Sequence, residues 1–325
     1  MTNKNDLIEE IRSHLESVYD DYRNGTLKEL DAIKHIGIND EKDSVVLIVE
    51  TSQKESKAED ELKRKIAKVI KLDLGYSGVK IQFEEAKTIA NIASSSTKII
   101  LIAGLKGGCG KSSLTINLAY ALKNASKKVA IIDADILGSS IVKMLHATDS
   151  GLNVNSVNKI IPPRHDGIEL MSIDFFSSDD TDALMWRSEM LSSMINNYIF
   201  QVAWDKDTDY ILVDLPSTTG DSLLDIASYL PTSSVLIVSD EDRIGAISAY
   251  KTYKAIKELN LDMIGIVVNK YQGNDYAYDY LSKQCTSTEV LAKIPYTKLD
   301  DNYVFADSQA IQIMSDLASL IIIHE

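Results

Sequence analysis

The first third of the chain alternates short apolar strands with amphipathic helical spacing. Apolar residues at helical spacing predict a helix over residues 5–23, and the same spacing over residues 62–70 predicts a second one. Alternating or β-branched apolar residues predict strands at residues 45–49 and 79–83. Residues 1–86 are therefore expected to form a small α/β domain, near the lower size limit for independent folding.

An Ala- and Ser-rich stretch without periodicity, residues 87–97, is expected to be a linker. Beyond it, short continuous apolar runs alternate with helical segments, which is typical of parallel strands covered on both faces. The expected strands are 99–103, 129–132, 211–213, 234–238 and 264–268, and the expected helices are 113–123, 246–259 and 276–284. Residues 98–325 are therefore predicted to form a doubly wound, mostly parallel α/β domain with its ligand at the carboxyl ends of the strands.

Composition narrows the possible partners and location. The net charge of −14 argues against a broad nucleic-acid surface, although it does not exclude a local basic patch. Two cysteines cannot build a disulfide framework, which fits a reducing cytoplasm. The chain shows no signal-peptide core, and its apolar C-terminal segment lacks the basic face of a membrane-surface helix. We expect that segment to be a docked helix rather than a membrane anchor.

A glycine-rich segment follows the first strand of the larger domain. It reads Gly-Leu-Lys-Gly-Gly-Cys-Gly-Lys-Ser-Ser from residue 104 and precedes a predicted helix. Glycines let backbone N–H groups converge on phosphate oxygens, Lys111 supplies a positive charge, and the Ser112 hydroxyl is a magnesium ligand. The strict P-loop pattern has glycine where Leu105 stands, so a turn without ligand is the alternative. The predicted nucleotide-binding residues are Gly107, Gly108, Cys109, Gly110, Lys111, Ser112 and Ser113.

A second lysine, Lys106, begins this loop and is unnecessary for an ordinary P-loop. The segment resembles the deviant Walker A pattern Lys-Gly-Gly-x-Gly-Lys-Ser/Thr, shared by the Mrp, MinD, ParA, nitrogenase iron-protein and arsenical-ATPase families. The resemblance implies a homodimer in which Lys106 crosses to the phosphates of the partner and acts catalytically with Lys111. Added positive charge there would stabilise a departing γ-phosphate. The alternative is a solvated surface lysine.

Acidic residues end two of the predicted strands. Asp214 follows an apolar run in Walker B form and is a candidate magnesium ligand. Asp133 is a candidate supporting group for the same metal, and Asp135 is a candidate catalytic residue that orients the attacking water. Acids at strand ends also cap helices, so that role remains open for both. Residues 217–221 after Asp214 form a candidate segment for sensing the γ-phosphate.

Base selection depends on the segment that follows the last predicted strand. Asn269 offers both a donor and an acceptor, which suits adenine. A guanine site of the Asn-Lys-x-Asp type would have a carboxylate where Gln272 stands. The sequence therefore favours ATP over GTP, with Mg²⁺ as its metal.

These motifs together resemble the Mrp/ApbC branch, the P-loop iron–sulfur cluster carriers. Residues 133–141 are similar to the Asp-Ala-Asp-Ile-Tyr-Gly-Pro-Ser-Ile segment of that branch, and residues 185–187 resemble its Trp-Arg-Gly segment. Residues 209–221 resemble its Asp-Tyr-Leu-Val-Ile-Asp-Leu-Pro-Pro-Gly-Thr-Gly-Asp segment, and residues 1–86 resemble the small domain that many Mrp proteins carry. The resemblance implies an ATPase linked to iron–sulfur protein maturation.

The chain departs from that branch where the cluster would bind. Carriers hold a bridging cluster with Cys-x-x-Cys a few residues after the base-reading asparagine, whereas residues 272–277 here contain no cysteine. Cys285 is single, and two copies of it in a dimer fall short of four thiolate ligands. Cys109 lies inside the phosphate loop. The sequence therefore predicts that this chain does not bind a cluster directly.

Three functions are compatible with these residues. The first is a slow, dimer-dependent Mrp-type ATPase without its own cluster, acting with a client that the sequence does not identify. The second is a MinD- or ParA-like positioning ATPase, which needs no cysteines, but the acidic charge and the lack of a basic membrane helix argue against it. The third is a nucleotide-binding module without turnover, which the retained Lys106, Lys111, Asp135 and Asp214 argue against.

Overall fold

The structure is a computed structural model of the chain. It describes residues 4–21, 25–30, 32–39, 43–51, 57–85, 96–147, 152–155, 159–176, 194–195, 197–217, 226, 230, 232–301 and 303–323. The chain divides into two compact units, Met1–Ile92 and Ala93–Glu325. Residues 87–95 of the expected linker, residues 185–187 and residues 218–221 of the expected sensing segment lie outside the described residues.

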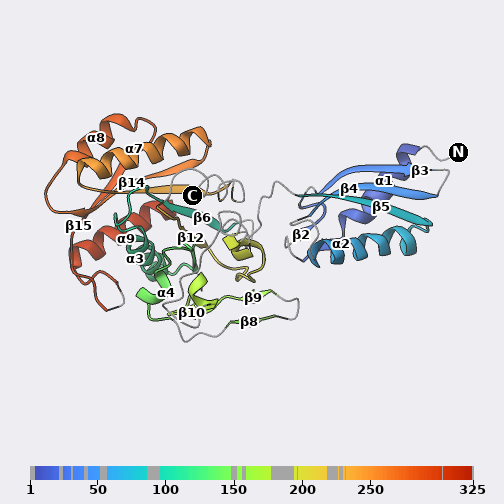
Figure 1. The fold of residues 1–325 in the computed structure, drawn as a ribbon, viewed down its shortest axis with the longest axis horizontal. Helices are drawn as coiled ribbons and strands as arrows, with labels where there is room; N and C mark the ends of the chain where they lie inside the picture. Colours follow the sequence, from blue (N-terminus) through green and yellow to red (C-terminus); the bar gives the residue numbers. More distant parts are fainter. Residues whose placement is uncertain are drawn as a thin grey trace. The chain divides into compact units, whose positions relative to one another are not determined.

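The first unit packs helices on a three-stranded sheet with the order β3-β4-β5. Its elements are α1 (Lys4–Glu16), β1 (Tyr19–Asp20), β2 (Gly25–Thr26), β3 (Ile33–Asn39), β4 (Ser44–Thr51), α2 (Lys57–Lys68), the π-helical turn η2 (Val69–Asp73) and β5 (Gly78–Glu85) (Figure 1). Val45, Leu47 and Val49 of β4 are fully buried, because alternate residues of a strand face the same side.

The helix predicted over residues 5–23 is too long. α1 ends at Glu16, and β1 then pairs with β2 in an antiparallel hairpin. Leu15 and Val18 are both buried, as their helical spacing predicts, although Val18 lies beyond the end of α1. The spacing of apolar residues predicts which side chains are buried in the core. It does not fix the backbone conformation that buries them.

The second unit is built on an eight-stranded sheet with the order β10-β11-β7-β12-β6-β13-β14-β15. The strands are β6 (Lys98–Ala103), β7 (Val129–Asp133), β10 (Arg164–His165), β11 (Ile168–Met171), β12 (Tyr210–Asp214), β13 (Ser234–Asp240), β14 (Asp262–Tyr271) and β15 (Val290–Pro295). Every pairing is parallel except that of β10 with β11. The predicted doubly wound, mostly parallel architecture is confirmed.

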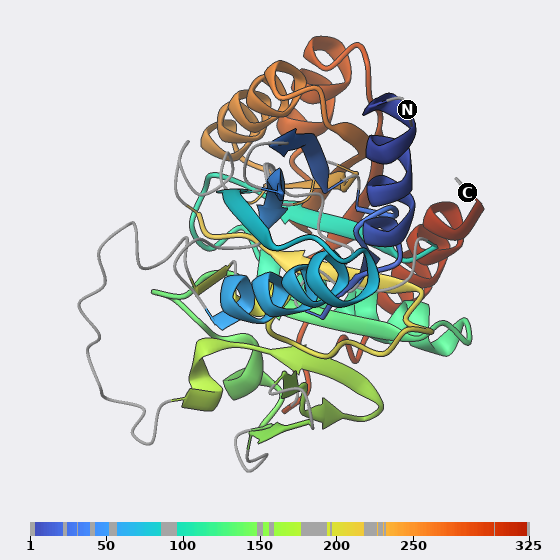
Figure 2. The same cartoon turned by 90° about the vertical axis from the view of Figure 1, so that its right-hand side faces the viewer.

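Helices cover both faces of this sheet, as Figures 1 and 2 show. α7 (Arg243–Glu258) and α8 (Tyr276–Gln284) pack together on one face. α3 (Lys111–Asn124) and α9 (Ser308–Ile323) pack together on the other. The remaining elements are α4 (Ile141–Met144), the 3-10 turn η3 (Ile173–Phe176) and the small hairpin of β8 (Asn153–Val154) and β9 (Ile160–Ile161). Covering on both faces explains why the central strands are continuous apolar runs.

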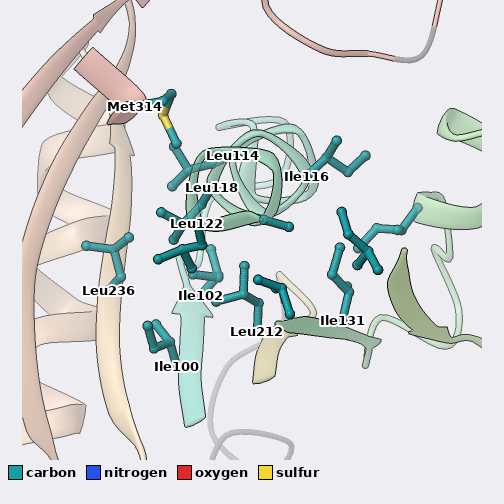
Figure 3. Close-up of a cluster of buried hydrophobic side chains, with 14 of the residues drawn as sticks. Ile100, Ile102, Leu114, Ile116, Leu118, Leu122, Ile131, Leu212, Leu236 and Met314 are labelled. Carbon is teal, nitrogen blue, oxygen red and sulfur yellow. The ribbon is translucent and has the colours of Figure 1, made fainter. Parts of the chain in front are cut away.

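The core of the second unit lies beneath α3. In Figure 3, Leu118 and Leu122 of α3 lie over the strand residues Ile102 and Leu212, and Met314 reaches the cluster from α9. α9 is therefore the docked terminal helix that the sequence predicts. Among the described residues, no helix combines the length and apolarity needed to cross a bilayer.

Candidate nucleotide-binding site

The glycine-rich segment forms the turn between β6 and α3. Gly108 and Gly110 have φ angles of 77° and 91°, a region that favours glycine. A side chain at Gly104 would meet the carbonyl oxygen of Val238 at 2.7 Å. The turn thus brings its backbone to the amino terminus of α3, where free N–H groups and the helix dipole favour an anion.

Lys111 and Ser112 begin α3 and point to the next strand of the sheet. The Lys111 ammonium donates to the Ser217 hydroxyl at 2.6 Å, and this lysine is only 6% exposed. The Ser112 hydroxyl donates to Asp214 Oδ2 at 2.6 Å, and the Thr115 hydroxyl lies 3.4 Å from Asp214 Oδ1. The predicted phosphate-binding lysine and the two predicted magnesium ligands therefore converge at one point.

Asp133 and Asp214 lie directly opposite each other because β7 and β12 are paired in parallel register. Both carboxyls are almost completely buried. Burial, followed by the charge of Asp214, raises the pKa of Asp133 to about 8. Burial also raises the pKa of Asp214 to about 6, against the opposing hydrogen bond from Ser112. Two such carboxyls favour a site that binds positive charge between or beside them.

Asp133 also performs the capping role that the sequence left open. Its Oδ2 accepts hydrogen bonds from the backbone N–H groups of Ser140 at 3.1 Å and Ile141 at 3.3 Å, at the start of α4. Its Oδ1 accepts from the N–H of Asp135 at 3.3 Å. Asp135 itself accepts from the N–H of Gly138 at 3.1 Å. Asp133 thus fixes the loop that carries Asp135, and the metal and catalytic roles of these two residues stay predictions.

Asn269 and Lys270, at the end of β14, hold the phosphate loop. The Asn269 amide donates to the carbonyl oxygen of Cys109 at 3.0 Å, and the Lys270 ammonium donates to that of Gly108 at 2.7 Å. Asn269 is therefore in contact with the loop, and base recognition by it stays a prediction. Lys270 was not among the predicted site residues, although its place after Asn269 is a usable signal.

Lys106 is bound within its own chain. Its ammonium contacts Asp240 Oδ2 and lies 2.8 Å from Asp242 Oδ2. Asp240 ends β13, and Asp242 caps the amino terminus of α7. Neither acid was predicted as a site residue. Lys106 is thus neither a free surface lysine nor, in a single chain, directed at a partner.

The segment after β14, residues 272–275, is anchored by carboxylates. Glu241 accepts hydrogen bonds from the N–H groups of Gln272 at 2.7 Å and Asn274 at 2.9 Å. Asp275 pairs with Lys293 at 2.9 Å and accepts from the Tyr271 hydroxyl at 2.9 Å. These contacts fill the position where the family resemblance places Cys-x-x-Cys.

The two cysteines are poor cluster ligands. Cys109 and Cys285 are both buried and free. Burial raises the pKa of both thiols, that of Cys285 to about 11, which disfavours the thiolate that iron requires. Within the described ranges, no group of histidine, cysteine and acidic side chains has the arrangement of a metal site.

A phosphate loop at the carboxyl end of a parallel sheet, with a buried lysine and a Walker B carboxylate, defines the class of P-loop NTPases. Residues 95–283 match the ParA family profile described as the NUBPL iron-transfer P-loop NTPase. The chain belongs to this family of iron–sulfur cluster carrier and transfer NTPases.

Curated relatives support the same assignment. An iron-sulfur cluster carrier protein of Bacillus subtilis is 30% identical over 80% of this chain and 77% of its own length. The iron-sulfur cluster transfer protein NUBPL of Mus musculus is 35% identical, but over only 53% of this chain and 54% of its own length. The cell division ATPase MinD of Pyrococcus furiosus, at 22% identity and a TM-score of 0.53 over 70% of this chain and 99% of that one, shares the fold.

Proposed function

We propose that this chain is a Mg²⁺-dependent ATPase that switches between a single and a dimeric state in iron–sulfur protein maturation, without carrying a cluster itself. The observation that carries the proposal is the convergence of Lys111, Ser112 and Asp214. A buried ammonium, a hydroxyl and a carboxylate at the amino terminus of α3 are the groups that bind a Mg²⁺-triphosphate.

The donors beside the phosphate loop suit magnesium. Ser112 Oγ and Asp214 Oδ2 are hard oxygen donors only 2.6 Å apart, and the nearby Asp133 adds negative charge. Ser112 would hold the ion directly and Asp214 through water. When bound there, Mg²⁺ neutralises charge on the phosphate oxygens.

The other site residues have distinct tasks in this proposal. The backbone N–H groups of residues 107–113 and the Lys111 ammonium bind the phosphates, and Lys111 exchanges Ser217 for a phosphate oxygen. Asp135 orients the attacking water, and Asn269 contacts adenine while bracing the loop. Lys106 of the second subunit adds charge at the departing γ-phosphate, as the deviant Walker A resemblance implies.

The link to iron–sulfur maturation rests on family membership, because relatives are named as cluster carriers. The sequence contains only two cysteines, both buried and neither in Cys-x-x-Cys. We therefore assign this chain a regulatory or scaffolding task on a client protein, in which ATP-driven dimerisation rather than cluster transfer is the output.

The enzymatic proposal is tested by phosphate release and particle mass on purified full-length protein. With Mg²⁺ and ATP we expect slow turnover, and with a non-hydrolysable ATP analogue we expect a dimer. Lys111→Ala should lower turnover about a hundredfold, whereas the exposed-lysine control Lys298→Ala should leave it unchanged. Equal turnover in wild type and Lys111→Ala would show that the loop is not catalytic.

The cargo proposal is tested by anaerobic reconstitution with iron and sulfide. We expect colourless protein with far less than one iron per chain, while the Bacillus subtilis carrier treated in parallel serves as the positive control. A brown, iron-loaded dimer of this chain that retains its cluster on gel filtration would contradict the proposal.

A further inference from the structure

The contact between Lys106 and two carboxylates is at odds with a lysine that acts on another subunit. In the single chain, the Lys106 ammonium lies between Asp240 at the end of β13 and Asp242 at the start of α7. The lysine is 26% exposed and the Asp240 side chain 16% exposed, so the pair is partly shielded from water. Partial shielding strengthens a charge–charge contact relative to one at the open surface.

Asp242 is held by α7 as well as by Lys106, and Asp240 lies against the start of the same helix. Asp242 Oδ1 accepts the N–H of Gly245 at 2.7 Å as the helix N-cap. Asp240 fits beside the helix because residue 245 is glycine; a Cβ there would overlap the Asp240 carboxylate. The second oxygen, Asp240 Oδ1, is buried without a hydrogen-bond partner in the described part of the chain. Two preset negative charges therefore face the first residues of the phosphate loop.

The protonation state of Lys106 agrees with this geometry. Burial lowers its pKa, but hydrogen bonds and charges from Asp240 and Asp242 outweigh burial and leave the pKa raised. The pKa of Asp242 is lowered, chiefly by its hydrogen bond from Lys106. Lys106 and Asp242 are therefore charged near neutral pH, and the ammonium is occupied by its two carboxylate contacts.

An ammonium that donates to these two carboxylates has two of its three N–H donors occupied and its charge offset, so it is poorly placed to stabilise a phosphate on another subunit. We propose that Asp240 and Asp242 are positioning residues that latch Lys106 inside its own subunit and release it only when two ATP-bound subunits close. The inference rests on the proposed function for the trans role of Lys106. The latch opposes dimerisation, so a subunit without nucleotide stays monomeric. The same contact holds the phosphate loop in one conformation.

The latch itself is tested in nucleotide-free protein, where dimerisation plays no part. The double variant Asp240→Asn/Asp242→Asn keeps the side-chain shapes, and asparagine can still cap α7. We expect an amine-reactive ester at neutral pH to label Lys106 several-fold faster in this variant than in wild type, as read by peptide mass spectrometry. Labelling of Lys298 is the internal standard. An unchanged Lys106 rate would overturn the latch whatever the protein does with ATP.

The consequence for assembly is tested by particle mass against protein concentration, with Mg²⁺ and a non-hydrolysable ATP analogue. The double variant should dimerise at a concentration about tenfold lower than wild type, because each wild-type subunit has to break the two partly exposed ion pairs of Lys106 on closing. Asp275→Asn, which removes the unrelated Asp275–Lys293 pair, is the matched control and should dimerise like wild type. Weaker or equal dimerisation of the double variant would overturn the latch.

The two proposals fail in different ways. If wild type and the double variant both stay single with the analogue bound, the proposed dimeric switch fails, and Lys106 labelling still decides whether the carboxylates hold the lysine. If wild type dimerises but the double variant does so no more readily, the latch fails and the switch stands.

Discussion

The phosphate loop and the segment that follows β14 lie at the same end of the sheet. They differ in whether they contain the residues that the family resemblance predicts. At the loop, Lys111 donates to Ser217, and Ser112 donates to Asp214 at the end of β12. In the segment, residues 272–275 are bound by Glu241 and by the Asp275–Lys293 pair, and no thiol is present. The residues predicted to bind nucleotide therefore contact one another, whereas the segment where the family resemblance places Cys-x-x-Cys is held by carboxylates.

This contrast predicts that the phosphate loop and residues 272–275 can be altered separately. The loop residues contact one another and the central strands. The backbone N–H groups of Gln272 and Asn274 instead donate to Glu241, in the turn before α7. Loss of cysteine from the segment therefore leaves the hydrogen bonds of Lys111 and Ser112 intact. Substitutions in each region should affect different measurements.

The largest effect is expected from Asp214→Asn. The substitution removes a charge beside Ser112 and the proposed magnesium position, so phosphate release should fall about a hundredfold or more. The folded chain should not lose stability in proportion, because one of two opposed buried carboxyls is neutralised. Phosphate release measures the turnover and urea unfolding measures the stability, each on the same preparation. A parallel loss of stability and turnover would contradict this account.

The same pair of carboxyls predicts a pH dependence of stability. In the folded chain the pKa values of Asp133 and Asp214 are about 8 and about 6, above the 3.8 of a free aspartate. The folded state therefore binds more protons than the unfolded state between those limits. The free energy of unfolding should fall by a few kcal/mol, to order of magnitude, as pH rises from about 4 to about 8.

Urea unfolding without nucleotide or metal measures this slope. Asp214→Asn should flatten it in part, because the variant lacks one titrating carboxyl and the charge that, after burial, raises the pKa of Asp133. Asp279→Asn, an exposed acid on α8, should keep the wild-type slope. An identical slope in all three proteins would show that the buried pair is not the cause.

Gly110→Ala should disturb the loop through two separable effects. Gly110 has a φ of 91°, and an added Cβ would overlap the Asn269 amide that holds Cys109. We expect a loss of about 1–3 kcal/mol in unfolding free energy and weaker nucleotide binding. Gly167→Ala is the control for backbone strain alone, because Gly167 has a φ of 81° with open space around it. Equal losses of unfolding free energy in the two variants would show that the overlap with Asn269 contributes nothing.

The smallest effect is expected from Glu241→Ala, which tests the replaced cargo segment. Loss of the acceptor for Gln272 and Asn274 should cost about 1 kcal/mol of stability and speed hydrogen exchange at those two amides. Phosphate release should stay within about twofold of wild type, as it should in the surface control Glu258→Ala. A large loss of turnover would show that the two regions are coupled after all.

Local pattern was sufficient for much of this protein. Continuous apolar runs identified the central strands of the second unit, and the glycine loop between one of them and a helix identified the phosphate site. The same pattern missed β3, β11 and β15, in which polar residues such as His35, Glu169 and Lys293 interrupt the apolar sequence. His35 and Lys293 lie on edge strands and reach solvent, whereas Glu169 is buried and is accommodated by its ion pair with Arg164.

The sequence by itself determined the fold class, the nucleotide loop and the lack of paired cysteines, because each depends on residues adjacent in the chain. Only the tertiary structure decided which distant side chains meet. Parallel register sets Asp133 against Asp214, and the turn into α7 brings Asp240 and Asp242 to Lys106. Such contacts join residues whose spacing carries no periodic signal, so packing of the sheet and its helices had to place them.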